Sequence, residues 1–248
     1  KDLNKIKINI KKIFKISKFD NENSVLTKFV PFHKGRIKLK KEVVPIGKKL
    51  KHRVKNNHLS PDQWNKFILR KDSFIIDTRK EFEFKIGTFK NSINPKINNF
   101  RDFSKYFRKY KKNSKIGMFC TGGIRCEKAS DYLKSKGYTN IFQLKGGIIN
   151  YLSKIDKKKS LWKGECFVFD NRVSVNHNLK SGKYSICAGC REPISFKDKN
   201  SSKFEEGVSC PSCYDKSTEN QKSRFRMRQS QIYKAKQSKK KYFFQKTV

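Results

Sequence analysis

The most reactive group that the sequence predicts is a thiolate at Cys120. Apolar residues lead up to this cysteine, and a glycine-containing loop then reaches Arg125 and a helical pattern. This order is typical of a buried parallel strand that presents a thiol at the carboxyl end of a sheet. Gly122 and Gly123 allow backbone angles at which successive N–H groups turn toward an anion, and the helix N-terminus and Arg125 add positive charge. These features favour the nucleophilic thiolate; a structural cysteine that ends a strand is the alternative.

Four cysteines in the C-terminal third predict a metal site. They form two Cys-x-x-Cys pairs separated by nineteen residues, and they are Cys187, Cys190, Cys210 and Cys213. This spacing is typical of a tetrahedral zinc ion held by four thiolates, with two sulfurs from each turn. A closed shell of four cysteines leaves no position for substrate, so the predicted zinc is structural. A redox pair and unligated thiols are the alternatives.

The composition favours an intracellular protein, and its positive charge is compatible with binding to nucleic acid. The chain carries 61 Lys and Arg against 21 Asp and Glu, a formal net charge of +40. Such a charge permits RNA binding, although a biased genome would also produce an excess of lysine. Seven cysteines are too few for a secreted disulfide scaffold of this length, which favours a reducing cytoplasm. No apolar run reaches the roughly 18 residues of a membrane span, so we expect no membrane partner.

The C-terminal tail from residue 222 to 248 is basic and contains no acidic residue. Basic side chains neutralise phosphates, and the interspersed aromatic residues can stack on unpaired bases. The predicted RNA-binding residues are Arg224, Arg226, Arg228, Lys239, Lys240 and Lys241. A solvated, disordered tail is the alternative, and disorder that becomes ordered on RNA satisfies both.

Strands alternate with helices in the middle of the chain. Ser60 and Pro61 are typical of the N-cap and first position of a helix. The other predicted elements are a strand at 74–77, a loop at 84–89, a short strand at 92–95, a helix at 99–110, strands at 116–120 and 141–144, and helices at 127–136 and 148–155. This alternation predicts a parallel α/β sheet. Farther on, we expect one strand at 161–170 with Cys166 buried, and His177 in a solvated turn.

Residues 58–155 resemble a rhodanese domain. The strand that ends in Asp77-Thr-Arg79, the loop from Cys120 to Arg125 and the double glycine after Leu144 are similar to motifs of that family. Four residues separate Cys120 from Arg125, as in the sulfur-handling rhodaneses, whereas their phosphatase relatives have one more. The resemblance implies that Arg125 supports the thiolate or the loop, and that Asp77 and Arg79 order the neighbouring strand ends. The sequence departs from the family at three positions: Thr88 replaces a frequent His, Tyr151 a frequent Trp, and Cys126 a common Ser.

Longer strings are similar to one subfamily, the rhodanese-type tRNA uridine hydroxylases. The strings lie at 41–47, 86–89, 120–130 and 164–172. This resemblance implies oxygen-dependent hydroxylation of the wobble uridine, position 34, to 5-hydroxyuridine in the anticodon loop of tRNA. It also implies O2 and an unidentified reductant, and no flavin- or nucleotide-binding motif is seen. Cys120 would either carry a persulfide or attack the pyrimidine ring. A sulfurtransferase that uses the same thiol, and a non-catalytic zinc-containing RNA-binding module, are the alternatives.

The predicted division of the chain follows from these patterns. It comprises the end of an α+β, ferredoxin-like domain at 1–47 whose start we expect to be missing, a linker at 48–57, the rhodanese domain at 58–156, a four-cysteine, zinc-ribbon-like module at 157–221 and the basic tail at 222–248. A helix at 1–18 and extended residues at 28–45 support the first of these. The sequence predicts no oligomeric state.

Overall fold

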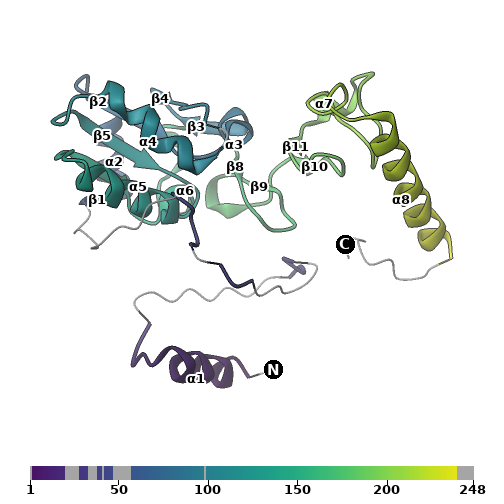
Figure 1. Cartoon of the computed structure of the whole chain (residues 1–248), viewed down its shortest axis with the longest axis horizontal. Helices are drawn as coiled ribbons and strands as arrows, with labels where there is room; N and C mark the ends of the chain where they lie inside the picture. The colour runs from purple at the N-terminus through teal and green to yellow at the C-terminus, as the bar shows by residue number, and fades with distance from the viewer. Residues whose placement is uncertain are drawn as a thin grey trace. The chain divides into compact units, whose positions relative to one another are not determined.

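The computed structural model describes residues 2–19, 28–32, 38–40, 42–46, 57–97 and 99–238 (Figure 1). The described residues fall into two units, one that ends at Pro31 and one that begins at Phe32. In the first unit the predicted N-terminal helix is observed as α1 (Leu3–Phe14). It begins where a carboxylate oxygen of Asp2 accepts hydrogen bonds from the N–H groups of Asn4 and Lys5. Satisfying these first N–H groups is the usual role of an aspartate N-cap.

The extended segment predicted at 28–45 forms no strand among its described residues, 28–32, 38–40 and 42–45. Alternating hydrophobicity forms a strand only where a second strand satisfies its backbone groups, and none of the described strands pairs with these residues. His33 and residues 47–56, most of the predicted linker, lie outside the described residues. The ferredoxin-like domain therefore stays a prediction.

A five-stranded parallel sheet forms the centre of the second unit, as predicted. Its order is β1 (Asn57–Leu59), β6 (Ile141–Leu144), β5 (Lys115–Phe119), β2 (Ser73–Asp77) and β4 (Ser92–Ile93). Asp77 lies opposite Phe119 in the register of β2 and β5. The residues that follow these two strands therefore emerge side by side at the carboxyl edge of the sheet.

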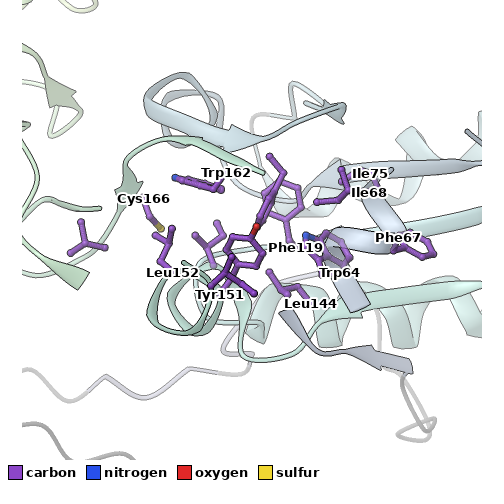
Figure 2. Packing of buried hydrophobic residues seen from close by; sticks show 14 of the residues in the cluster. Trp64, Phe67, Ile68, Ile75, Phe119, Leu144, Tyr151, Leu152, Trp162 and Cys166 are labelled. Carbon is purple, nitrogen blue, oxygen red and sulfur yellow. The ribbon is translucent and has the colours of Figure 1, made fainter. Parts of the chain in front are cut away.

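Both faces of the sheet are buried, because successive strand residues point to opposite sides. Phe119 packs with α2 (Pro61–Ile68) and α6 (Gly147–Lys154) on one face, and the core there includes Trp64 and Tyr151 (Figure 2). Met118 packs on the other face with α4 (Phe103–Tyr106) and α5 (Ile124–Ser135). The start of α2 is as predicted: Ser60 and Gln63 form a capping box, and Pro61 opens the helix.

Two predicted segments differ from the structure. The loop expected at 84–89 is instead the end of α3 (Glu81–Ile86) followed by β3 (Gly87–Phe89). Glu83 starts this helix by accepting the N–H of Lys80 at 2.9 Å, and six residues are too few to show helical periodicity. The single helix expected at 99–110 is divided into η1 (Phe100–Asp102), α4 and η2 (Phe107–Lys109).

The strand predicted at 161–170 is two short strands. β7 (Trp162–Gly164) pairs with β3, and β8 (Cys166–Phe167) pairs with β9 (Ser174–Val175). The division falls after Gly164, whose φ of 82° is a left-handed conformation and whose absent Cβ would meet the Ile86 oxygen at 2.3 Å. Trp162 and Cys166 join the core around Phe119, so this core continues beyond residue 156 (Figure 2).

The remaining elements surround the cysteine pairs and form the C-terminal helix. They are η3 (Lys157–Lys159), η4 (His177–Leu179), β10 (Ser185–Ile186), β11 (Pro193–Ile194), α7 (Phe196–Lys199) and α8 (Glu219–Gln237). The disordered tail that was the alternative for 222–248 is wrong as far as Gln237, because Thr218 and Gln221 form a capping box that starts α8. Within the described residues, none of the helices combines the length and apolar character that a membrane span requires.

Candidate active site and metal centre

Cys120 follows β5 at the carboxyl edge of the sheet and is 2% exposed. Its Sγ accepts a hydrogen bond of 3.1 Å from the N–H of Gly123. Gly122 is exposed, and the space into which a Cβ there would project is open for 4 Å. One N–H group of the predicted cradle, that of Gly123, therefore donates to the sulfur, and the loop has open space at Gly122.

The double glycine predicted to close the domain holds this loop in place. The N–H groups of Ile148 and Ile149, at the start of α6, donate to the carbonyls of Cys120 and Thr121 at 3.0 and 3.1 Å. A Cβ at Gly147 would lie 2.5 Å from the Cys120 oxygen, so only glycine permits this approach.

Arg125 is fixed by a residue to which the sequence analysis assigned no role. Its two terminal nitrogens donate to the two oxygens of Glu83 at 2.9 and 3.0 Å. The Glu83 side chain is 1% exposed, and the pair joins α3 to the Cys120 loop. Burial opposes ionisation of Glu83, but the hydrogen bonds and charge of Arg125 hold its pKa below the ordinary value. In the sequence, the only indication of a partner for Arg125 was that an acidic residue follows shortly after the Asp-x-Arg string.

The surroundings of Cys120 favour its thiolate. A hydrogen bond from the thiol of Cys126 lowers the pKa of Cys120 to about 6, against the effect of burial, and the charge of Arg125 adds to this lowering. Burial raises the pKa of Cys126 well above its ordinary value, so Cys126 remains a donor. Thr78 Oγ1 lies 3.5 Å from the Cys126 sulfur and also donates to the Phe119 carbonyl at 3.0 Å. Both cysteines are free.

We predict that Cys120 titrates near pH 6, so that its thiolate is almost fully formed at neutral pH and is lost as pH falls below 6. The measurement is thiolate absorbance at about 240 nm over a pH series, taken as wild type minus Cys120→Ser so that other thiolates cancel. Cys126→Ala should raise the midpoint toward about 8.5, the value of a free cysteine, whereas Cys126→Ser keeps a donor and a low midpoint. A wild-type midpoint at or above the free-cysteine value would contradict this assignment.

Asp77 and Arg79 form a fully buried ion pair at the end of β2. Arg79 donates to both oxygens of Asp77, at 2.9 and 2.6 Å, and to the Gly87 carbonyl at 2.6 Å. Thr88, which departs from the family pattern, donates to Asp77 at 3.1 Å and so joins the same network. Tyr151, the second departure, donates to Asn65 at 2.6 Å. The ion pair thus ties the end of β2 to β3.

Asp77→Asn should lower the free energy of unfolding by about 3–5 kcal/mol, because it leaves the charge of Arg79 buried without compensation. Urea unfolding followed by circular dichroism measures this change. The matched control is Asp72→Asn, which removes an exposed partner of Arg70 and Lys115 and should have little effect. Equal losses in the two variants would contradict a structural role for the buried pair.

The four predicted metal ligands converge. Their sulfur atoms all lie within 4.8 Å of one another, with separations of 3.9 Å for Cys187–Cys213, 3.7 Å for Cys190–Cys210 and 3.8 Å for Cys210–Cys213. A tetrahedron with zinc–sulfur bonds of about 2.3 Å has edges of about 3.8 Å. The donor set and its geometry therefore fit zinc, which would be held by four thiolates in a structural role.

The predicted RNA-binding residues of α8 have partners within the protein. Arg226 forms a bidentate pair with Glu205 at 2.7 Å, and Arg228 donates to the carbonyls of Ala188 and Gly207 beside the cysteine pairs. Arg224 is exposed and makes a long hydrogen bond of 3.4 Å to the Asn220 carbonyl. Lys239, Lys240 and Lys241 lie outside the described residues. RNA binding by these residues stays a prediction.

Two further residues were singled out in the sequence. Cys166 is fully buried, as predicted, and burial raises its pKa to about 12. His177 differs from the prediction of a solvated side chain. Its Nε2 is buried with no hydrogen-bond partner among the described residues, and burial lowers its pKa. Neither residue adds a reactive group to the loop.

The parallel sheet and its Cys120 loop define a protein with a rhodanese-like domain, and the family model for that domain matches residues 60–154. The chain is also 58% identical over 246 residues to the tRNA uridine(34) hydroxylase of Pelagibacter ubique, an alignment that covers 99% of this chain and 82% of that protein. The chain therefore belongs to the tRNA uridine(34) hydroxylase family.

Solved structures with similarity to this chain include two rhodanese-type proteins. A rhodanese-related protein from Thermoplasma volcanium is 24% identical, covering 39% of this chain and 90% of that one, with a TM-score of 0.34. A single-domain sulfurtransferase from Saccharomyces cerevisiae is 18% identical, covering 41% and 92%, with a TM-score of 0.35.

Proposed function

We propose that this protein hydroxylates uridine 34 of tRNA at carbon 5, with O2 as the oxygen source, to give 5-hydroxyuridine. The observation that carries the proposal is the 58% identity over 99% of the chain to a tRNA uridine(34) hydroxylase. The geometry of Cys120 is in keeping with it, since the loop holds a nucleophile whose pKa is lowered to about 6. A wobble base is unpaired in a free anticodon loop, so it can enter a pocket without melting a duplex.

The residues of the loop have separate roles. Gly123 and the charge of Arg125 stabilise the anionic sulfur, and Glu83 holds Arg125 in one orientation. The uridine would approach from the open side at Gly122. There the thiolate would either add to the pyrimidine ring, which activates the neighbouring carbon, or act as a persulfide. Hydroxylation by O2 needs two electrons from an unidentified reductant, and the second oxygen atom leaves as water.

Nucleoside mass spectrometry of tRNA tests this function. A strain that lacks the gene should lose 5-hydroxyuridine when grown in air, and a plasmid copy should restore it. Growth without oxygen should lower the modification in the complemented strain as well. Equal amounts of 5-hydroxyuridine with and without the gene would contradict the proposal.

Sulfur transfer is the second candidate, and the four-residue spacing from Cys120 to Arg125 favours it. In this function the Cys120 thiolate would take sulfane sulfur as a persulfide and pass it to a small acceptor or to tRNA. Turnover of thiosulfate by the purified protein, with tRNA nucleosides unchanged by the gene, would replace the first function with this one.

The proposed cellular location, partner and metal follow from the family and from the cysteines. A tRNA substrate and seven unpaired cysteines favour the cytoplasm. The partner is tRNA, engaged through its anticodon loop. Zinc is the proposed occupant of the four-cysteine site.

A further inference from the structure

Residues 105–112 comprise the end of α4, η2 and the first residues after it, and they form an exposed basic segment. Its five basic residues are Lys105, Arg108, Lys109, Lys111 and Lys112, all of them exposed. No acidic residue occurs from residue 103 to 115. Among the described parts of the chain, no carboxylate pairs with any of the five. The segment therefore presents positive charge that no carboxylate of the described residues neutralises.

Aromatic rings orient two of these lysines. The Nζ of Lys109 lies 4.2 Å from the ring centre of Tyr106 and 5.3 Å from that of Tyr110, and the Nζ of Lys112 lies 3.9 Å from the ring centre of Tyr138. Cation–π contacts position an ammonium group without removing its charge.

The rings are themselves fixed. The hydroxyls of Tyr106 and Tyr110 are hydrogen-bonded at 3.0 Å, Tyr138 donates to the Phe107 carbonyl at 2.6 Å, and Tyr110 packs on Phe74. A rigid platform beneath the lysines lowers the entropy lost when they bind a ligand.

Three of the basic residues of α8, Lys222, Arg226 and Arg228, differ in this respect. Arg226 is paired with Glu205, Lys222 is paired with Glu219 at 2.9 Å, and Arg228 is bonded to backbone carbonyls. Ion pairs of this kind must be broken or shared before these side chains can contact phosphates. The segment 105–112 needs no such exchange.

The basic segment and the thiolate lie at opposite ends of β5. The segment ends three residues before Lys115, the first residue of β5, and Cys120 follows the last. The strand between Lys115 and Cys120 covers about 17 Å, at about 3.3 Å per residue. A few stacked nucleotides span such a distance, so one RNA can reach both places.

We infer that the basic segment 105–112 binds the sugar–phosphate backbone of the tRNA substrate while its wobble base occupies the Cys120 loop. This inference rests on the proposed function for the identity of the RNA. The segment serves for affinity and positioning, and it takes no part in the chemistry at the sulfur.

The test compares two variants that lose the same charge. The platform variant is Arg108→Gln/Lys109→Gln/Lys112→Gln, and the control is Lys157→Gln/Lys158→Gln/Lys159→Gln on the exposed η3. Fluorescence anisotropy measures binding of an in vitro transcribed tRNA that has uridine at position 34, over a series of salt concentrations. The platform variant should bind about tenfold more weakly, with a log–log salt slope lower by about 2, which is three charges at about 0.7 each. The control should change by less than about threefold.

A second variant keeps the test decisive if the triple variant folds poorly. Lys105→Gln/Lys111→Gln removes two exposed charges of the same segment, and it should lower the salt slope by about 1.4, two charges at about 0.7 each. Equal effects of the platform and control variants would overturn the inference, because binding would then follow net charge alone. Unchanged binding in both segment variants would also overturn it. Failure of the wild-type protein to form 5-hydroxyuridine, scored separately by nucleoside mass spectrometry, would count against the proposed function and not against the site of binding.

Discussion

Cys120→Ser should abolish 5-hydroxyuridine formation, with a loss of about a thousandfold or more. A serine hydroxyl is not ionised at neutral pH, whereas the loop holds Cys120 with a pKa of about 6. The serine side chain is close in size to cysteine and can accept the hydrogen bond from the N–H of Gly123, so the fold should be unaffected. Nucleoside mass spectrometry of tRNA from a deletion strain that carries each variant measures the effect.

The control for this variant is Cys166→Ala, which removes a different buried thiol. Burial raises the pKa of Cys166 to about 12, so it is protonated and we expect modification to persist. Wild-type levels of 5-hydroxyuridine with Cys120→Ser would exclude a catalytic thiol. They would favour instead the non-catalytic RNA-binding alternative drawn from the sequence.

Removal of zinc should unfold the part of the chain around the cysteine pairs. Its small core consists of the four cysteines with Ile194 and Phe204, so the ligands themselves are most of what packs there. Structural zinc supplies about 10–16 kcal/mol of apparent binding free energy in small zinc modules, and that free energy is folding free energy. We expect one zinc per chain by elemental analysis, and Cys210→Ser to lose it.

Limited proteolysis locates this unfolding. In Cys210→Ser, or after chelation, cleavage should appear between residues 187 and 213, while the parallel sheet of residues 57–144 resists. Ser212→Ala lies in the same turn but supplies no ligand sulfur, and it should retain both zinc and protease resistance. A protein isolated without metal and equally resistant with and without chelator would exclude the zinc assignment.

Local patterns predicted much of the central domain correctly. Apolar runs that ended at Asp77 and Cys120 indicated buried parallel strands, and the structure places their ends side by side. The sheet is buried on both faces, so each strand had to be apolar throughout, and such runs are visible in a sequence. The Cys-x-x-Cys pairs were equally easy to recognise in the sequence, because each pair must place two sulfurs on one turn. Short elements were not predicted: α3 has six residues, and its end was expected to be a loop. The alternation at 28–45 indicated extended backbone, but no described strand pairs with the described residues of that range.

By itself the sequence determined the class of fold, and it predicted Cys120 as the nucleophile and the four ligand cysteines, since each depends on residues close together along the chain. Only the tertiary structure decided what surrounds them. Glu83 lies 42 residues from Arg125 yet holds it in place, and Cys126 donates to the sulfur whose pKa it lowers. The structure also decided which basic residues remain unpaired. Arg226 finds Glu205 across 21 residues, whereas the two oriented lysines of 105–112 meet only aromatic rings among the described residues. The sequence gives the charge of each residue. Whether that charge is neutralised depends on the distance to an opposite charge, which falls to a few ångströms only after folding.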